Sequence, residues 1–368
     1  MLQSEKVYCY GWVSLMQGLL PLHLNYVREI SGDEEKRKVK FGIYGCRHFH
    51  LEIALTEMLE MGHECVGIYE PEGSLAKKLA EKYGIKVLNS AEAFFQAEPE
   101  MALCSSVNSE KIDRIEECCA RGIHIMLDKP LVSCQADYDR LLKAMESGAQ
   151  IGLMLTERFS APARRLKELV DEGVLGDVVG LYFSKPHKLM PENRESWHFD
   201  KTKNGGPVID LSIHDLDLMR WVTGSEIKDI MGIMKVGDRP EYPDLYDDVK
   251  MVVEMENGVT GSLMCDWWTP DAYPMFGDEI ISCTGTKGRC VVHDTGDPNL
   301  HKEPYLTLCT ENEPEVILTA DEPKTGLMKD FLDRINGLPC IITQEDVLLS
   351  TKATLDADKA VKVVRINR

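Results

Sequence analysis

Short apolar runs alternate with helix-forming stretches between residue 39 and about residue 155, and this alternation is the strongest constraint on the fold. The expected strands are Val39–Tyr44, Glu64–Tyr69, Met101–Ser105, His124–Leu127 and Ile151–Leu155, with helices between them at 49–61, 74–83, 110–121 and 136–147. Two strands that pair in parallel need a crossover connection, which is usually a helix. The pattern therefore predicts a doubly wound parallel sheet, that is, a Rossmann-like nucleotide-binding domain over residues 39–155.

The pattern changes after residue 155, where a helix is expected at 162–172 and a buried helix at about Val208–Val222. Strands follow at Ile227–Val236, Val249–Glu256, Val259–Trp268, Glu279–Cys283, Cys290–His293, Tyr305–Cys309 and Val316–Leu318, and helices at 324–336 and 343–362 close the chain. Asn257-Gly258 is a strong hairpin signal, so these strands should form a large, open, mainly antiparallel sheet. One face of such a sheet packs on helices and the other can pair with a second subunit, which predicts a homodimer or homotetramer.

We expect an α/β chain in four parts. These are an extension of unknown role at 1–38, the NAD-binding domain at 39–155, an α+β substrate-binding and oligomerisation domain at 156–345, and a C-terminal helix and tail at 346–368 that pack back on the body. Residues 7–27 are moderately apolar, as in a signal peptide, but Gln17 and Pro21 interrupt them and no small-residue cleavage pattern follows. We therefore favour a non-secreted extension of a cytoplasmic protein.

Composition narrows the classes of function. The 368 residues carry a net charge of -19, which argues against a nucleic-acid-binding surface. No run of about 20 apolar residues occurs, so no membrane span is expected. The 12 cysteines are scattered without a C-x-x-C pair, as expected for reduced thiols in the cytoplasm, and they predict no zinc site.

The expected buried helix at Val208–Val222 carries polar residues among apolar ones. The spacing of Asp210, His214 and Asp217 places them on one face of a continuous helix. A buried carboxylate and imidazole are costly unless they are paired or used, and together they are what proton transfer needs. Two alternatives stay open, namely a satisfied Asp–His pair of the core and a pair of helical metal ligands without an obvious third ligand.

The first strand ends at Gly45-Cys46-Arg47-His48-Phe49-His50, where a dinucleotide-binding domain has G-x-G-x-x-G. Only the first glycine is present, and Arg47 would either crowd the pyrophosphate or pair with it. Glu70 closes the second strand 25 residues after Gly45, near the usual spacing for the carboxylate that binds the ribose hydroxyls. Because Glu70 would repel a 2′-phosphate, NAD is expected rather than NADP. The alternative is a doubly wound domain that has lost its nucleotide.

Asp128-Lys129-Pro130 follows the expected strand at His124–Leu127. The end of a strand in a doubly wound sheet faces the ligand crevice, so Lys129 could place an ammonium group beside a substrate. The alternative is that Lys129 is a solvated surface group, as most lysines are.

Taken together, these segments resemble the Gfo/Idh/MocA family, which includes glucose–fructose oxidoreductase, inositol dehydrogenase and rhizopine-catabolism proteins. The family's E-K-P motif matches Asp128-Lys129-Pro130, and its G-G-x-x-x-D-x-x-x-H-x-x-D helix matches the segment from Gly205-Gly206 through Asp210 and His214 to Asp217. Segments 158–176 and 285–288 are also similar to the family, so the resemblance covers roughly residues 39–365. The chain departs from the family pattern at Arg47, His50 and Asp128, and residues 1–38 have no counterpart.

The resemblance implies an NAD-dependent dehydrogenase of a secondary alcohol on a sugar, cyclitol or glycoside, and often a cis Lys129–Pro130 bond. His214 would accept the hydroxyl proton, Lys129 would stabilise the alkoxide, and Asp210 would orient the site, whereas Asp217 would be structural. The expected cofactor contacts are Gly45, Arg47, His48, Phe49, Glu70, Ser106, Asn108, Asp128 and Lys129. The expected substrate contacts are Lys129, Arg158, Trp197, His198, Asp210 and His214, with His187 as a weaker candidate; no metal is expected.

Two other functions stay open. Some members of this fold oxidise a sugar hydroxyl transiently, then cleave a glycoside or epimerise a centre and return the hydride, so that no NADH accumulates. A family member could instead be a non-catalytic sensor of NAD or a sugar, although the presence of Lys129, Asp210 and His214 argues against a sensor. Release of aglycone with catalytic NAD would identify the first function, and an NADH titration followed by a panel of polyols would test the second.

Overall fold

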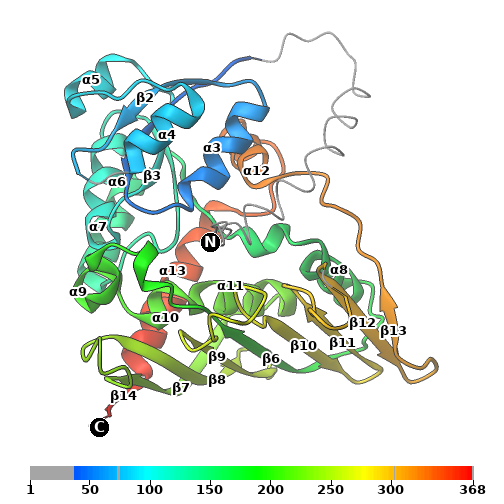
Figure 1. Cartoon of the computed structure of the whole chain (residues 1–368). Helices are drawn as coiled ribbons and strands as arrows, with labels where there is room; N and C mark the ends of the chain where they lie inside the picture. The colour runs from blue at the N-terminus through cyan, green and yellow to red at the C-terminus, as the bar shows by residue number, and fades with distance from the viewer. Residues whose placement is uncertain (1–36, 73–74, 302, 367–368) are drawn as a thin grey trace, which may run out of the picture.

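A computed structural model of the chain describes residues 37–72, 75–301 and 303–366 (Figure 1). The expected extension at 1–38 therefore lies almost wholly outside the described residues. The described part forms a five-stranded and a nine-stranded sheet, each with its own hydrophobic core. No helix in these three segments combines the length and the apolar character that a bilayer crossing needs.

The N-terminal sheet is wholly parallel and has the strand order β2-β1-β3-β4-β5. Its elements are β1 (Lys40–Cys46), α3 (Leu51–Glu60), β2 (Glu64–Tyr69), α4 (Leu75–Tyr83), α5 (Ala91–Gln96), β3 (Met101–Ser105), η1 (Asn108–Glu110), α6 (Lys111–Cys119), β4 (His124–Leu127), α7 (Gln135–Met145) and β5 (Ile151–Leu153). The strand order reverses between β1 and β3, which is where a doubly wound sheet opens a crevice for a ligand. The predicted doubly wound domain is confirmed.

The second sheet is open and mixed, with the order β13-β12-β11-β10-β6-β9-β8-β7-β14. Its strands are β6 (Val178–Pro186), β7 (Ile227–Val236), β8 (Tyr246–Met255), β9 (Thr260–Asp266), β10 (Ile280–Gly285), β11 (Gly288–His293), β12 (Tyr305–Thr310), β13 (Val316–Leu318) and β14 (Lys362–Arg365). Only β6 with β9 and β7 with β14 pair in parallel, so the predicted mainly antiparallel sheet is confirmed.

Helices cover one face of this sheet, whereas none of the described helices covers the other face (Figure 1). The covering helices are α8 (Ala161–Asp171), α10 (Pro207–Asp210), α11 (Ser212–Thr223) and α13 (Gln344–Ala360). Between the two sheets the chain also forms η2 (Thr156–Phe159), η3 (Pro191–Asn193), η4 (Ser196–Phe199) and α9 (Lys201–Asn204). The last short helix, α12 (Leu327–Ile335), packs against α3 of the N-terminal domain.

Three elements differ from the sequence-based expectation. The single helix expected at Val208–Val222 is broken at Leu211 (φ -105°, ψ -52°) into α10 and α11. Strand β6, at the centre of the sheet, is not predicted, because Gly180 and Lys185 interrupt its apolar alternation. Strand β14 is not predicted either, because it follows α13 directly, with neither a glycine nor a proline to mark the end of the helix.

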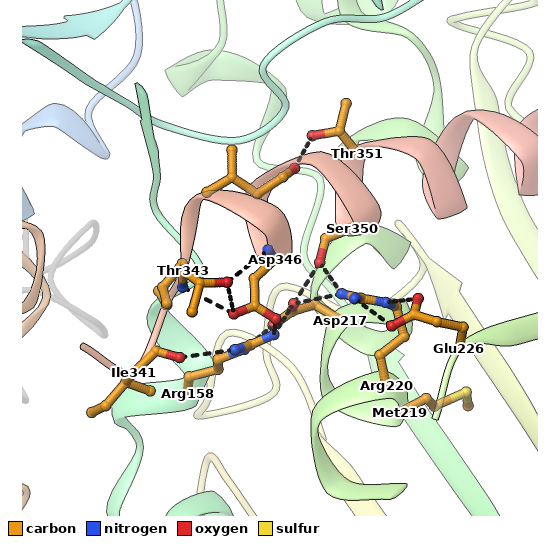
Figure 2. A network of polar contacts seen from close by, with 12 residues as sticks. Arg158, Asp217, Met219, Arg220, Glu226, Ile341, Thr343, Asp346, Ser350 and Thr351 are labelled. Atoms are coloured by element: carbon orange, nitrogen blue, oxygen red, sulfur yellow. Dashed lines mark hydrogen bonds and ion pairs between the residues drawn. The ribbon is translucent and has the colours of Figure 1, made fainter. Parts of the chain in front are cut away.

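A buried ion-pair network fixes α11 against α13 and η2 (Figure 2). Asp217 on α11 accepts hydrogen bonds from Arg158 Nε at 2.8 Å, Arg158 Nη2 at 2.7 Å and Ser350 Oγ at 2.6 Å. Arg158 also contacts Asp346 Oδ1 at 3.0 Å and donates to the Ile341 carbonyl at 3.1 Å. Since Arg158 and Asp217 are each only 1% exposed, this network locks the helix that carries His214.

Candidate active site

The loops after β1 and β3 touch at the crevice. Gly45 has φ of +102°, and a Cβ at this position would lie 1.9 Å from Ser106 Oγ. A side chain at position 45 would therefore be strained in its backbone and would collide with the neighbouring loop. The structure brings these two predicted cofactor residues together.

The loop that follows Gly45 is held by hydrogen bonds within the protein. Cys46 N donates to Glu70 Oε2 at 2.8 Å, so the predicted ribose-binding carboxylate lies beside the loop. Arg47 N and His48 N both donate to the Ser105 carbonyl, at 2.8 and 3.1 Å. Phe49 N and the N–H of the next residue donate to no described group, and they precede the first turn of α3. Such N–H groups at the start of a helix are suited to binding a phosphate.

The guanidinium of Arg47 is not free to bind a phosphate at the start of α3. Its Nε donates to Glu195 at 2.9 Å, and its Nη1 lies 3.1 Å from Glu72. The side chain thus joins the loop to the segment before η4. The expected contact between Arg47 and a pyrophosphate would require this pairing to change.

His48, His50 and Asp128 form a cluster that could hold a metal ion, with ligand atoms within 4.8 Å of one another. His48 Nδ1 lies 3.2 Å from Asp128 Oδ2, and burial holds the pKa of both histidines well below the usual value. Asp128, however, already has a counter-charge, because the buried Lys111 ammonium contacts it. This pairing weakens Asp128 as a metal ligand, and we assign no metal to the cluster.

Lys111 also organises the Asp128-Lys129-Pro130 segment. Its Nζ donates to the carbonyls of all three residues, at 3.0, 3.2 and 3.1 Å, and the side chain is fully buried. The expectation of a cis Lys129–Pro130 bond is confirmed. Sequence reasoning missed Lys111, because a lysine in the first turn of an amphipathic helix gives no sign that it is buried.

Lys129 and Asp210 meet across the two domains. Lys129 Nζ donates to Asp210 Oδ1 at 2.7 Å and to the Asp210 carbonyl at 2.6 Å, and both residues are 7% exposed. Burial opposes the ionisation of Asp210, but the Lys129 ammonium, together with the more distant Arg194, holds the pKa of Asp210 well below its usual range. The break at Leu211 leaves Asp210 at the end of α10 while His214 lies on α11.

His214 is partly buried, with 13% of its side chain exposed, and it is neutral. Burial, reinforced by the ammonium groups of Lys129 and Lys185, lowers the pKa of His214 to about 3. Its Nδ1 makes no hydrogen bond with the residues that the structure describes, and Glu157 Oε1 lies 3.9 Å away. A neutral imidazole close to an ammonium group is what a proton acceptor beside a developing alkoxide requires.

The structure does not bring Arg158 or Asp217 into this site. Both belong to the network of Figure 2, and Arg158 has no surface free for a substrate. Arg158 is therefore corrected from a substrate contact to a structural residue. The expected single stripe of Asp210, His214 and Asp217 is likewise corrected, because the chain breaks after Asp210 and Asp217 faces Arg158.

Trp197 and His198 lie over the loop that follows β1. Their rings stack with centroids 3.6 Å apart, and the His198 ring lies 5.4 Å from that of His48. Asn108 Nδ2 donates to the Asn204 carbonyl at 2.9 Å, which joins η1 to α9. The structure thus brings Trp197 and His198 to the loop after β1, and Asn108 to α9.

His187 makes a hydrogen bond through one ring nitrogen and has a carboxyl group near the other. Nδ1 lies 2.9 Å from the Lys185 carbonyl, and Nε2 lies 3.6 Å from Glu279 Oε1. Burial lowers the pKa of His187 to about 3. We therefore treat His187 as part of the wall of the site.

Behind His214 lies a buried cluster that sequence reasoning missed. Lys185 contacts Glu157 and lies 3.2 Å from Asp215 Oδ1. Glu279 and Asp294 also act on the charge of Lys185, so that one lysine faces four carboxylates. These residues come from separate elements, and Lys185 lies on the strand that was not predicted, so no local pattern could have revealed the cluster.

Comparison with known proteins shows the family to which the chain belongs. Residues 39–155 match the family model described as an oxidoreductase family with an NAD-binding Rossmann fold, and residues 163–291 match the GFO/IDH/MocA C-terminal domain. The chain therefore belongs to the Gfo/Idh/MocA family of oxidoreductases. It is an enzyme of the dehydrogenase type that acts on CH–OH groups, with a nicotinamide cofactor.

The chain is similar over most of its length to individual members. It is 24% identical to scyllo-inositol 2-dehydrogenase (NAD(+)) of Bacillus subtilis over 85% of each chain. A solved oxidoreductase of Erwinia carotovora atroseptica has a TM-score of 0.82 at 21% identity, covering 89% of this chain and 100% of that one. A 3-ketoreductase of Actinomadura kijaniata, solved with NADP, has a TM-score of 0.75 at 16% identity, covering 90% and 100%. Some curated relatives are matched over only about half of their length, 54% for the myo-inositol 2-dehydrogenase of Thermotoga maritima.

Proposed function

We propose that the protein is an NAD-dependent dehydrogenase that oxidises a secondary alcohol on a sugar, cyclitol or glycoside. The observation that carries this proposal is the 2.7 Å contact between Lys129 Nζ and Asp210 Oδ1. The charges of both residues act on the pKa of His214, which is neutral. The names of the inositol dehydrogenases among the relatives support the substrate class.

Each of the three residues has a distinct part in this reaction. His214 accepts the proton of the hydroxyl, since its low pKa leaves it neutral at pH 7. The Lys129 ammonium donates to the same oxygen and stabilises the negative charge that develops there. Asp210 orients Lys129 through their ion pair and can accept a hydrogen bond from a neighbouring hydroxyl. A bound nicotinamide supplies the hydride acceptor.

The residues around the β1 loop fit a dinucleotide. The close approach at Gly45, the Glu70 carboxylate beside the loop and the unpaired N–H groups before α3 are what a pyrophosphate and ribose need. We propose NAD rather than NADP, because a 2′-phosphate would meet Glu70. Fluorescence titration with NADH and NADPH tests this choice, and tighter binding of NADPH would contradict it.

We propose further that a second copy of the chain covers the open face of the nine-stranded sheet. Large apolar side chains are exposed on strands β6, β7 and β8: Tyr182 (44%), Met231 (65%), Ile233 (49%) and Val252 (51%). Soluble monomers rarely expose apolar patches of this kind. Sedimentation of the wild type and of a Met231→Lys, Ile233→Lys variant tests the proposal; a monomeric wild type contradicts it.

A substrate screen tests the reaction. The enzyme with NAD is offered inositols, aldoses, sugar acids and glycosides, and NADH absorbance is followed. We expect at least one polyol to yield NADH, and His214→Ala to abolish the signal while NADH still binds. Aglycone release without NADH would instead identify redox-neutral glycoside cleavage. Full turnover by His214→Ala would refute the assignment of the base.

A further inference from the structure

The surroundings of His214, the proton acceptor in the proposed reaction, oppose its protonation. Burial, together with the ammonium groups of Lys129 and Lys185, lowers the pKa of His214 to about 3, although the Asp217 and Asp210 carboxylates act in the opposite direction. An imidazole in such surroundings gains a proton only with difficulty. A negative charge close to the ring would offset this cost.

Glu157 is placed to provide that charge. Its side chain is buried, and Oε1 lies 3.9 Å from His214 Nδ1, a nitrogen without a hydrogen-bond partner in the described part of the chain. The other oxygen, Oε2, contacts Lys185 Nζ. Lys185 thus binds Oε2 of Glu157, and Oε1 remains facing the imidazole of His214. Nε2 of His214 makes no hydrogen bond with the described residues and remains available to a substrate hydroxyl.

Within the cluster, Glu157 is the carboxyl group that lies closest to the Lys185 ammonium. Burial raises the pKa of Asp215 to about 7 and that of Glu279 to about 8, so near neutral pH these two groups carry less negative charge than fully ionised carboxylates would. Asp294, which accepts a hydrogen bond from Ser160, also has a raised pKa because of its burial. The single lysine of the cluster contacts Glu157 most closely.

We infer that Glu157 is the positioning residue of the base, holding the His214 proton on Nδ1 so that Nε2 accepts the proton of the substrate. This inference rests on the proposed function for its role in turnover. When the O–H bond of the substrate breaks, its proton goes to Nε2 and the imidazolium forms between the alkoxide and the Glu157 carboxylate. Catalytic hydrogen bonds are often long before substrate binds, so the 3.9 Å separation would shorten in the complex.

The first test needs neither cofactor nor substrate. Nitrogen-15 labelling of histidine gives the tautomer of each imidazole by NMR, and the spectrum of His214→Ala identifies the signals of His214. We expect the Nδ1–H tautomer in the wild-type protein and a shift toward Nε2–H in Glu157→Gln. An Nε2–H tautomer in the wild type would overturn the inference, whatever the variant does.

The second test uses the polyol found in the screen. We expect Glu157→Gln to lower kcat about 10²-fold with KM and NADH binding unchanged, and Glu157→Asp, which keeps the charge, to recover part of the loss. Asp330→Asn is the matched control, because Asp330 is also buried and, among the described residues, its carboxylate accepts hydrogen bonds from the backbone N–H groups of Ile341 and Ile342. Equal kcat values in Glu157→Gln and Asp330→Asn would overturn the inference. If no polyol reacts with the wild type, the proposed function fails, and the tautomer decides the inference by itself.

Discussion

The buried Arg158–Asp217 pair allows a stability prediction with a definite size. Asp217→Asn removes a charge that accepts three hydrogen bonds, at 2.8, 2.7 and 2.6 Å. Removal of one partner of a buried ion pair usually costs about 3–5 kcal/mol, because the other charge stays buried without compensation. Arg158 keeps a second partner, Asp346, whose side chain is 22% exposed. We therefore expect the lower end, a loss of about 3 kcal/mol.

Scanning calorimetry measures this loss. In a domain of this size, 3 kcal/mol lowers the unfolding midpoint by about 6–12 °C. The double variant Arg158→Leu, Asp217→Leu removes both charges and should lose less than the single variant, since no unpaired charge of this pair remains. Circular dichroism controls for an altered fold. A single variant as stable as the wild type, or a double variant that loses as much as the single one, would refute the reasoning.

Three more predictions follow from the site. Lys129→Met should lower kcat about 10²–10⁴-fold without weakening NADH binding, and a normal kcat would contradict its role at the alkoxide. Gly45→Ala should abolish NADH binding in a fluorescence titration, because its Cβ would lie 1.9 Å from Ser106 Oγ; unchanged affinity would contradict the close approach. Burial raises the pKa of Glu279 from 4.5 to about 8, so its contribution to stability is present below pH 4.5 and is lost as the pH rises to about 8. Unfolding midpoints from pH 5 to 9 should therefore fall less in Glu279→Gln than in the wild type, and parallel curves would contradict this.

The sequence was sufficient to predict the N-terminal domain, because parallel strands covered on both faces appear as apolar runs of the right length. It was sufficient also to predict that Lys129 and Asp210 share a site, since each lies in a motif of the family. The course of the chain between them could not be predicted. The helix is interrupted at Leu211, one turn after two glycines with positive φ, Gly205 (96°) and Gly206 (82°). The apolar residues of 208–222 continue across this interruption, so the sequence pattern gives no sign of it.

Helix α11 explains why the polar residues of one segment have such different roles. His214 and Asp217 are only three residues apart, yet the first faces Glu157 and the second faces Arg158. Both partners belong to the same short element, η2 (Thr156–Phe159), where neighbouring side chains point in different directions. One side of η2 thus anchors α11 through a buried ion pair, while the other side presents a carboxylate to the imidazole. A change that loosens the Arg158–Asp217 pair should therefore disturb the His214–Glu157 separation as well, so we expect Asp217→Asn to alter the His214 tautomer as well as the unfolding temperature.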